Sequence, residues 1–132
     1  FEQLSVLQEE GVLPDAFIWV HAQSEKDSQK HIEAARRGAW ISLDGLSEDN
    51  ITDYTAMIKE LKKEGLLHKV LLSHDAGWYD PAKPAGGEVR GFNTLSRKLV
   101  PALLNDGFTK EDIRLLLEEN PVKAFEIKIR KK

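Results

Sequence analysis

Residues 70–75 read Val-Leu-Leu-Ser-His-Asp, a short apolar run that ends in two ionisable side chains. Two earlier stretches follow the same pattern, since Ala16–Val20 is followed by His21 and Ala39–Leu43 is followed by Asp44. All three runs are almost continuously apolar, which is typical of parallel strands that are buried on both faces. The sequence therefore predicts three buried parallel strands whose carboxyl ends carry ionisable groups.

Segments with apolar residues at helical spacing lie before, between and after these strands. They cover residues 3–10, 24–37, 50–65, 92–105, 109–120 and a short stretch from Pro121. Alternating helices and strands predict an α/β fold with right-handed crossovers. We expect Asn120-Pro121 to end the fifth helix, because the residue before a proline disfavours helical geometry. No linker or change of composition divides residues 1–132, so we expect one unit without an internal boundary.

The composition excludes several classes of function. The 132 residues include 19 Lys and Arg, 22 Asp and Glu and no Cys, and the net charge is −3. This charge gives no global reason to bind nucleic acid or an anionic membrane, and disulfides and thiolate metal sites are impossible. The basic residues after Ile127 predict a solvated end.

No apolar run approaches the ~20 residues that span a bilayer, and no secretory signal is visible. The chain starts at Phe1 and its only methionine is Met57, so we expect the natural amino terminus to lie upstream. The compartment is therefore left open between cytoplasm and periplasm.

Chemistry is expected where the three strands end, because function in parallel α/β folds gathers at the carboxyl ends of the strands. His21, Asp44, His74 and Asp75 would meet at that edge. Imidazole and carboxylate are ligands for zinc and related divalent ions. Such an ion lowers the pKa of water to about 7, and a nearby carboxylate can take the proton. Asp75 is the strongest candidate, because it directly follows an apolar strand and opens a long loop.

Structural roles compete with these functional ones. His21 could be a partly buried histidine bonded to a backbone carbonyl, and Asp44 could cap a helix or form a turn. His74 could line the site or point outward. His31 lies in a helical segment among charged residues, so we expect it to be a solvated surface histidine.

The long loop, Ala76–Gly91, contains four glycines and two prolines and lacks periodicity. Trp78 and Arg90 lie in it and could shape a substrate pocket, although the tryptophan could equally pack against the rim of the fold.

Four segments occur here in a recognisable order: FIWVHAQSE, GAWISLDGL, KVLLSHDAGW and LLLEENPVKAF. They resemble the last three strand–helix units of the phosphotriesterase-like branch of the amidohydrolase superfamily. Members of this family are metal-dependent hydrolases with a (β/α)₈ TIM barrel and usually a two-metal centre. The resemblance runs from Gln3 to Phe125 and implies the C-terminal part of such a barrel, namely strands six to eight with their helices.

The resemblance also implies roles for individual residues. His21 corresponds to the metal-binding histidine of strand six. Asp75 corresponds to the strand-eight aspartate, which binds metal, contacts the nucleophilic hydroxide and takes its proton. Asp44 corresponds to the acidic residue that ends strand seven. The family's histidine pair of strand one, lysine or glutamate of strand four and histidine of strand five have no counterpart in this chain.

Two departures from the phosphotriesterase pattern stand out. Gly45 occupies the place of a histidine that relays protons, and Ala22–Ser24 lacks the acidic residue expected after the strand-six histidine. Both departures put organophosphate hydrolysis in doubt, so a lactone or another ester is an equally good substrate.

Two hypotheses follow. In the first, the chain is the C-terminal fragment of a divalent-metal-dependent hydrolase that cleaves an ester, lactone or phosphoester, with zinc as the expected metal and two ions in the intact enzyme. Asp75 would be catalytic, His21 and Asp75 would bind metal, and substrate would contact four residues: Asp44, His74, Trp78 and Arg90. The fragment alone is expected to be inactive, and its partner would be the rest of the parent chain or a homo-oligomer.

In the second hypothesis, the chain is a non-catalytic α/β binding or assembly module. Such a module would have to cover its open strand edges by oligomerising, because unpaired edges expose backbone hydrogen-bonding groups.

Overall fold

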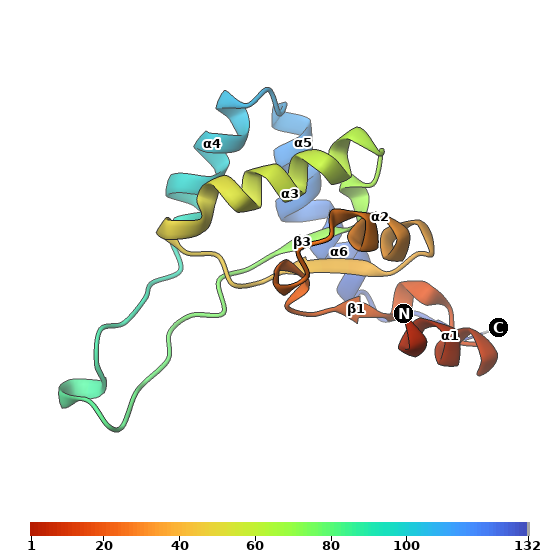
Figure 1. Cartoon of the computed structure of the whole chain (residues 1–132), viewed down its shortest axis with the longest axis horizontal. Coiled ribbons are helices and arrows are strands. Elements are labelled where there is room, and N and C mark those ends of the chain that lie inside the picture. The colour runs from red at the N-terminus through yellow and green to blue at the C-terminus, as the bar shows by residue number, and fades with distance from the viewer. Residues whose placement is uncertain (132) are drawn as a thin grey trace.

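The computed structural model describes residues 1–131, and its centre is a parallel sheet of three strands in the order β1-β2-β3 (Figure 1). The strands are β1 (Ile18–Trp19), β2 (Trp40–Leu43) and β3 (Val70–Leu72). They coincide with the three predicted apolar runs, so the α/β class and the parallel strands are confirmed. Within the described residues, β1 and β3 each pair with a strand on one side only.

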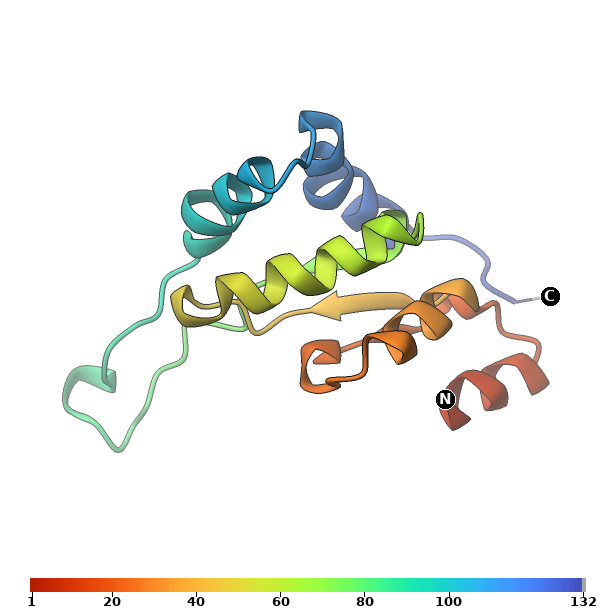
Figure 2. The same cartoon turned by 45° about the horizontal axis from the view of Figure 1, so that its top comes forward.

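Two helices provide the crossovers between the strands. Helix α2 (Ser28–Arg36) connects β1 to β2, and α3 (Ile51–Lys63) connects β2 to β3. Asp27 caps the first of these helices by accepting a hydrogen bond from the Gln29 amide at 3.0 Å. Ile32 of α2 and Ile58 of α3 belong to one core cluster with Ile41 of β2, so both helices cover the same face of the sheet, as right-handed crossovers require. Figures 1 and 2 show these helices and the strands from two directions.

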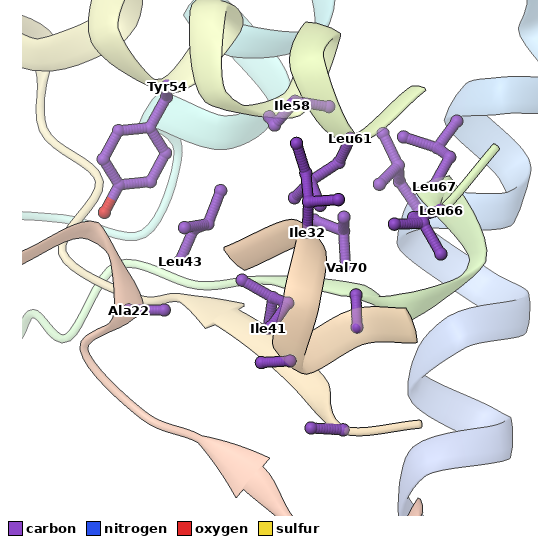
Figure 3. Close-up of a cluster of buried hydrophobic side chains, with 14 of the residues drawn as sticks. Ala22, Ile32, Ile41, Leu43, Tyr54, Ile58, Leu61, Leu66, Leu67 and Val70 are labelled. Carbon is purple, nitrogen blue, oxygen red and sulfur yellow. The ribbon is translucent and has the colours of Figure 1, made fainter. Parts of the chain in front are cut away.

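The main core lies between that face of the sheet and the helices (Figure 3). Ile41 and Leu43 of β2 are fully buried there, in contact with apolar side chains of α2 and α3. Its largest members include Ile32, Tyr54, Ile58, Leu61 and Val70. Alternate residues of a strand point to opposite faces. The other face of the sheet therefore carries a second, smaller cluster of Trp40, Leu71 and Ala124, with Ile18 packed against it.

The C-terminal helices cross the predicted break at Asn120-Pro121. Helix α5 (Lys110–Arg114) runs through a π-helical turn, Leu115–Glu119, into α6 (Asn120–Phe125) without interruption. The predicted end of the helix is therefore wrong. In the wider π turn the acceptor lies five residues before the donor instead of four, and this extra room accommodates a proline, which has no N–H group and a bulky ring.

Another π-helical turn, Leu95–Leu99, comes directly before Pro101 in helix α4 (Val100–Asn105). The same arrangement in two helices supports this explanation. Asn120 makes use of the continuous helix, because its buried amide donates to the carbonyls of Leu67 at 2.9 Å and Val70 at 2.8 Å. It thereby ties α6 to the start of β3.

The chain's two ends meet on the side of the sheet opposite the long loop (Figure 1). Helix α1 (Glu2–Glu9) is followed by Leu13, whose amide donates to the carbonyl of Arg130 at 2.8 Å. The Arg130 guanidinium donates in turn to the carbonyls of Ala124 at 2.8 Å and Glu126 at 3.1 Å. The expected solvated end is therefore wrong for Arg130, because this side chain satisfies carbonyls at the end of α6. In the part of the chain that the structure describes, no helix is long and apolar enough to cross a membrane.

Candidate active site

Two of the predicted site residues share an uncommon backbone conformation. His21 has a φ of 55° just after β1, and Asp75 has a φ of 44° just after β3. Side chains other than glycine pay about 1–2 kcal/mol for this left-handed region, so surrounding contacts have to hold them there. Within residues 1–131, Ala85 is the third such position outside glycine. Backbone strain at both strand ends is typical of functional sites.

A buried carboxylate orients the His21 ring. Asp44 is 5% exposed, and its Oδ1 lies 2.7 Å from the Nδ1 of His21. Its Oδ2 accepts from the His21 amide at 3.0 Å. Burial disfavours the charge of Asp44, but the hydrogen bonds from His21 and Gln23 outweigh burial and hold the pKa of this carboxyl below its ordinary value. Asp44 is therefore an anion, and an anion only accepts, so the proton of the imidazole lies on Nδ1.

This tautomer leaves Nε2 of His21 as the free lone pair. The side chain of His21 is 61% exposed, and within residues 1–131 its Nε2 makes no hydrogen bond. A histidine that ligates metal commonly donates its other ring N–H to a carboxylate, which fixes the ring and raises its basicity. The His21–Asp44 pair has the features that a metal-binding imidazole requires. The helix-capping alternative for Asp44 is not realised, because Ser47 and Asn50 form the capping box that precedes α3.

Gln23 completes this network and explains one departure from the family pattern. Its Nε2 donates to Asp44 Oδ1 at 3.0 Å, and its Oε1 accepts from the Asp44 amide at 3.1 Å. A Cβ on Gly45 would lie 2.8 Å from the Nε2 of Gln23 and 3.4 Å from the hydroxyl oxygen of Tyr54. A side chain at position 45 would therefore collide with the amide that holds Asp44. Gly45, which stands in place of the pattern's histidine, thus lies against Gln23, which belongs to the stretch Ala22–Ser24 that lacks the pattern's acidic residue.

Tyr54 supports the same turn from helix α3. Its hydroxyl accepts a hydrogen bond from the Gly45 amide at 2.7 Å, and burial raises the pKa of this phenol to about 12. The hydroxyl therefore stays protonated at neutral pH and adds no charge beside Asp44.

The Asp75 turn is held through its backbone. The carbonyl of Asp75 accepts hydrogen bonds from Trp78 Nε1, at 2.9 Å, and from the Arg90 guanidinium. Arg90 also donates to the carbonyl of His74 at 2.7 Å, while its own carbonyl accepts from the Gly77 amide at 3.1 Å. These bonds close the neck of the loop that Figure 1 shows extending from the body of the molecule. The Asp75 carboxylate itself makes no hydrogen bond or ion pair within residues 1–131, so it is available to a ligand.

His74 faces the root of the same loop. The residue is 8% exposed, and its Nε2 accepts a hydrogen bond from the Leu95 amide at 3.0 Å. Burial and the nearby Arg90 charge lower the pKa of His74, which favours the neutral ring that this bond needs. Trp78 is 69% exposed and leaves an indole face open to solvent. Contact of His74, Trp78, Arg90 and Asp44 with a substrate stays a prediction.

The prediction for His31 is wrong, and Gln23 was missed. His31 is 1% exposed in α2, where its Nε2 lies 2.7 Å from the carbonyl oxygen of Ala22. A signal for burial was present, because His31 lies four residues before the core residue Ala35, on the same helical face. Gln23 carried no comparable signal, since a glutamine in a surface turn and a glutamine that bonds a carboxylate have the same sequence context.

The described chain does not contain a complete metal site. Among residues 1–131, no group of three or more His, Cys, Asp or Glu side chains is placed to hold an ion. His21 and Asp75 follow the two outer strands of the sheet, on either side of β2. The donor types and the oriented imidazole fit a divalent metal, but further ligands are needed for a tight site.

Comparison with known proteins gives a family match. Residues 1–125 match the model of the "Phosphotriesterase family". The chain is 28% identical over 128 residues to the phosphotriesterase homology protein of Escherichia coli, which covers 95% of this chain and 43% of that protein. The phosphotriesterase homology protein of Mycobacterium tuberculosis is 26% identical over 133 residues, with coverage of 95% and 41%.

Solved structures of these relatives are similar to this chain in fold. The Escherichia coli protein, in a crystal structure with phosphate in its active site, superposes with a TM-score of 0.81 over 95% of this chain and 43% of that one, at 28% identity. The phosphotriesterase of Mycobacterium tuberculosis gives 0.80 at 25% identity, over 95% of this chain and 41% of that one. The chain thus spans less than half the length of these relatives, and it belongs to the phosphotriesterase family.

Proposed function

We propose that this chain forms strands six to eight, with their helices, of the (β/α)₈ barrel of a metal-dependent hydrolase. The observation that carries the proposal is the contact of 2.7 Å between His21 Nδ1 and Asp44 Oδ1, which directs the free Nε2 of a strand-end histidine outward. Four groups donate to the Asp44 carboxylate, namely the amide and the ring of His21, the side-chain amide of Gln23 and the hydroxyl of Ser42. Burying a carboxylate in this way to orient a histidine is costly if that histidine binds no metal.

His21 and Asp75 would be two of the ligands of a divalent metal centre, with zinc as the expected metal and two ions in the intact enzyme. A divalent ion supplies positive charge that makes water acidic enough to attack at neutral pH. Asp44 keeps the His21 ring in one orientation and one tautomer. Asp75 accepts the proton of the attacking water, because its carboxylate is exposed and has no competing donor within residues 1–131.

The remaining ligands would come from the rest of the parent chain. The relatives are more than twice as long as the part of them that this chain matches. The family resemblance implies a histidine pair on strand one, a lysine or glutamate on strand four and a histidine on strand five. Contacts with these strands would also cover the unpaired edges of β1 and β3.

The substrate would be a small ester, lactone or phosphoester. The loop Ala76–Gly91 would set specificity, with Trp78 offering an exposed aromatic face and Arg90 and His74 at its base. Asp44 would contribute to the substrate site from the end of β2. Gly45 occupies the place of the histidine from which phosphotriesterases relay protons, which favours a substrate whose leaving group needs no such relay. The phosphate in the active site of the Escherichia coli relative supports the same class of oxyanion chemistry.

The test is an Asp75→Asn substitution in the full-length protein. Loss of the carboxylate should lower turnover of an aryl ester, a lactone and an aryl phosphotriester at least about a hundredfold, the range of general-base effects. Bound zinc, measured by atomic emission after dialysis, should fall as well. Asp53→Asn, at an exposed position of α3, is the matched control and should change neither quantity.

Unchanged turnover and metal content in Asp75→Asn would overturn the proposed role. A soluble, monomeric 132-residue chain that melts cooperatively and ignores zinc would instead support the alternative of a non-catalytic binding module.

A further inference from the structure

The buried histidine of α2 contacts the peptide that follows the candidate ligand His21. His31 is 1% exposed, and its Nε2 lies 2.7 Å from the carbonyl oxygen of Ala22, a residue with no exposed surface. The His31 ring also packs edge-on against Trp19 of β1, with ring centroids 5.4 Å apart. His31 therefore joins helix α2 to both sides of the strained turn at His21.

The direction of this hydrogen bond is fixed by its partner. A carbonyl oxygen only accepts, so Nε2 of His31 carries a proton and donates it. The other ring nitrogen, Nδ1, is buried and has no partner within residues 1–131. A buried polar atom without a partner costs about 1–3 kcal/mol, and an apolar side chain of similar size would avoid that cost. Packing alone therefore does not account for a histidine here, whereas its Nε2–H group does something that no apolar residue could do.

One side of the turn is held by Asp44, which accepts from the His21 amide and from the Gln23 side chain. The amide of Ser24 donates to the His21 carbonyl at 3.0 Å, and the amide of Glu25 donates to the Ala22 carbonyl at 3.0 Å. Both bonds lie inside the turn, so neither fixes it relative to the rest of the fold. His31 supplies a second anchor, from helix α2, at the residue next to a φ of 55°.

We propose that His31 is a positioning residue for His21: by holding the Ala22 carbonyl, its Nε2–H keeps the left-handed turn in place and the His21 ring against Asp44. This inference rests on the proposed role of His21 as a metal ligand. Without the anchor, the turn can relax toward an unstrained conformation, and the imidazole loses its fixed direction. Metal affinity should then fall although every ligand is still present.

The experiment compares His31→Gln with His31→Leu in the full-length protein. The amide nitrogen of glutamine can occupy the place of Nε2 and donate to Ala22, whereas leucine fills the space without a donor. Cobalt is titrated into the metal-free proteins, and its visible absorption reports both affinity and coordination. Leucine should weaken binding about tenfold or more, as losses of such supporting contacts do, and glutamine should stay within about threefold of the unmodified protein.

His68→Leu is the matched control, because the ring of His68 also bonds a backbone carbonyl, that of Gly65 at 3.1 Å, but does so at the opposite end of β3. It should leave the titration unchanged. Thermal unfolding of the metal-free variants separates stability from positioning.

Cobalt binding by His31→Leu equal to that of the unmodified protein would overturn the inference, whatever its melting temperature. An equal loss of affinity in both variants would also overturn it, because the N–H donor would then be irrelevant. If the leucine variant does not fold, His31→Met takes its place. A tenfold loss of cobalt affinity in the glutamine variant then overturns the proposal, whereas retained affinity in the glutamine variant together with a tenfold loss in His31→Met supports it. An unmodified protein that binds no cobalt would instead contradict the proposed function itself.

Discussion

The two ends of the candidate active site, at His21 and at Asp75, are built in opposite ways. At His21 the side chain is fixed, because a buried carboxylate, a glutamine and a helix all converge on one turn. At Asp75 only the backbone is fixed, through carbonyls that accept from Trp78 and Arg90, and the carboxylate makes no hydrogen bond within residues 1–131. One end is embedded in the core, whereas the other is the root of an exposed loop.

Under the proposed function, this difference separates the task of the histidine from that of the carboxylate. An imidazole ligand has one free lone pair and must point in one direction, so it benefits from a rigid support. A carboxylate that binds metal and accepts a proton can use either oxygen, so it benefits from freedom to rotate. The embedded end should therefore govern stability and metal affinity, and the loop end should govern access and specificity.

The largest effect is expected for Asp44→Ala at the embedded end. The substitution leaves the His21 amide, the His21 ring and the Gln23 amide without their acceptor in a buried site. We expect the free energy of unfolding to fall by about 3 kcal/mol, because hydrogen bonds to a buried charge are worth about 1.5–3 kcal/mol each and some of these donors can turn to water. Urea denaturation of the full-length protein measures the loss.

Asp49→Ala, at an exposed position in the turn after β2, provides the reference and should change stability by no more than about 0.5 kcal/mol. A loss in Asp44→Ala no larger than in this reference would break the view that the His21 end is embedded in the core.

An intermediate effect is expected from Gly45→Ala. The new methyl group would displace the Gln23 amide from Asp44, at a cost of about 1–2 kcal/mol in unfolding free energy. Gln23→Ala removes the obstacle, so adding Gly45→Ala to that variant should cost almost nothing more. A double-mutant cycle by urea denaturation measures this coupling. Additive effects would mean that the two residues do not pack against each other in solution.

The smallest effect on global stability is expected at the loop end. Arg90→Met removes the donors to the carbonyls of His74 and Asp75. It should lower the free energy of opening the loop by about 1 kcal/mol, which raises the population of the open form about fivefold. Proteolysis within residues 76–91 should accelerate by that factor, with no change in the urea midpoint. Lys83→Met, which removes an exposed ion pair with Asp80 at the tip of the loop, serves as the comparison and should leave the rate unchanged.

A shift of the urea midpoint in Arg90→Met as large as that of Asp44→Ala would erase the distinction between the two ends.

Much of the fold was predictable because it depends on local patterns. The apolar runs before His21, Asp44 and Asp75 became β1, β2 and β3, and helical spacing located α2 and α3. The continuous helix through Pro121 was not predictable from propensity, because a π turn that accommodates the proline is stabilised by contacts elsewhere, including Asn120 on the start of β3. Arg130 likewise has the sequence context of a solvated charge. In the structure its guanidinium donates to carbonyls six and four positions earlier in the chain and to one in the turn before β1.

The residue types at the strand ends follow from the sequence alone, since an apolar run followed by His or Asp is a local property of the chain. The sequence therefore identified His21, Asp44 and Asp75 as candidates, and with the family resemblance it indicated metal-dependent chemistry. How these residues act on one another became visible only in the folded chain. Asp44 orients His21, Gln23 fills the space beside Gly45, and His31 is buried against Ala22. The physical reason is that hydrogen-bond direction and desolvation depend on neighbours from other elements, and parallel strands bring those neighbours together only after the crossovers have folded.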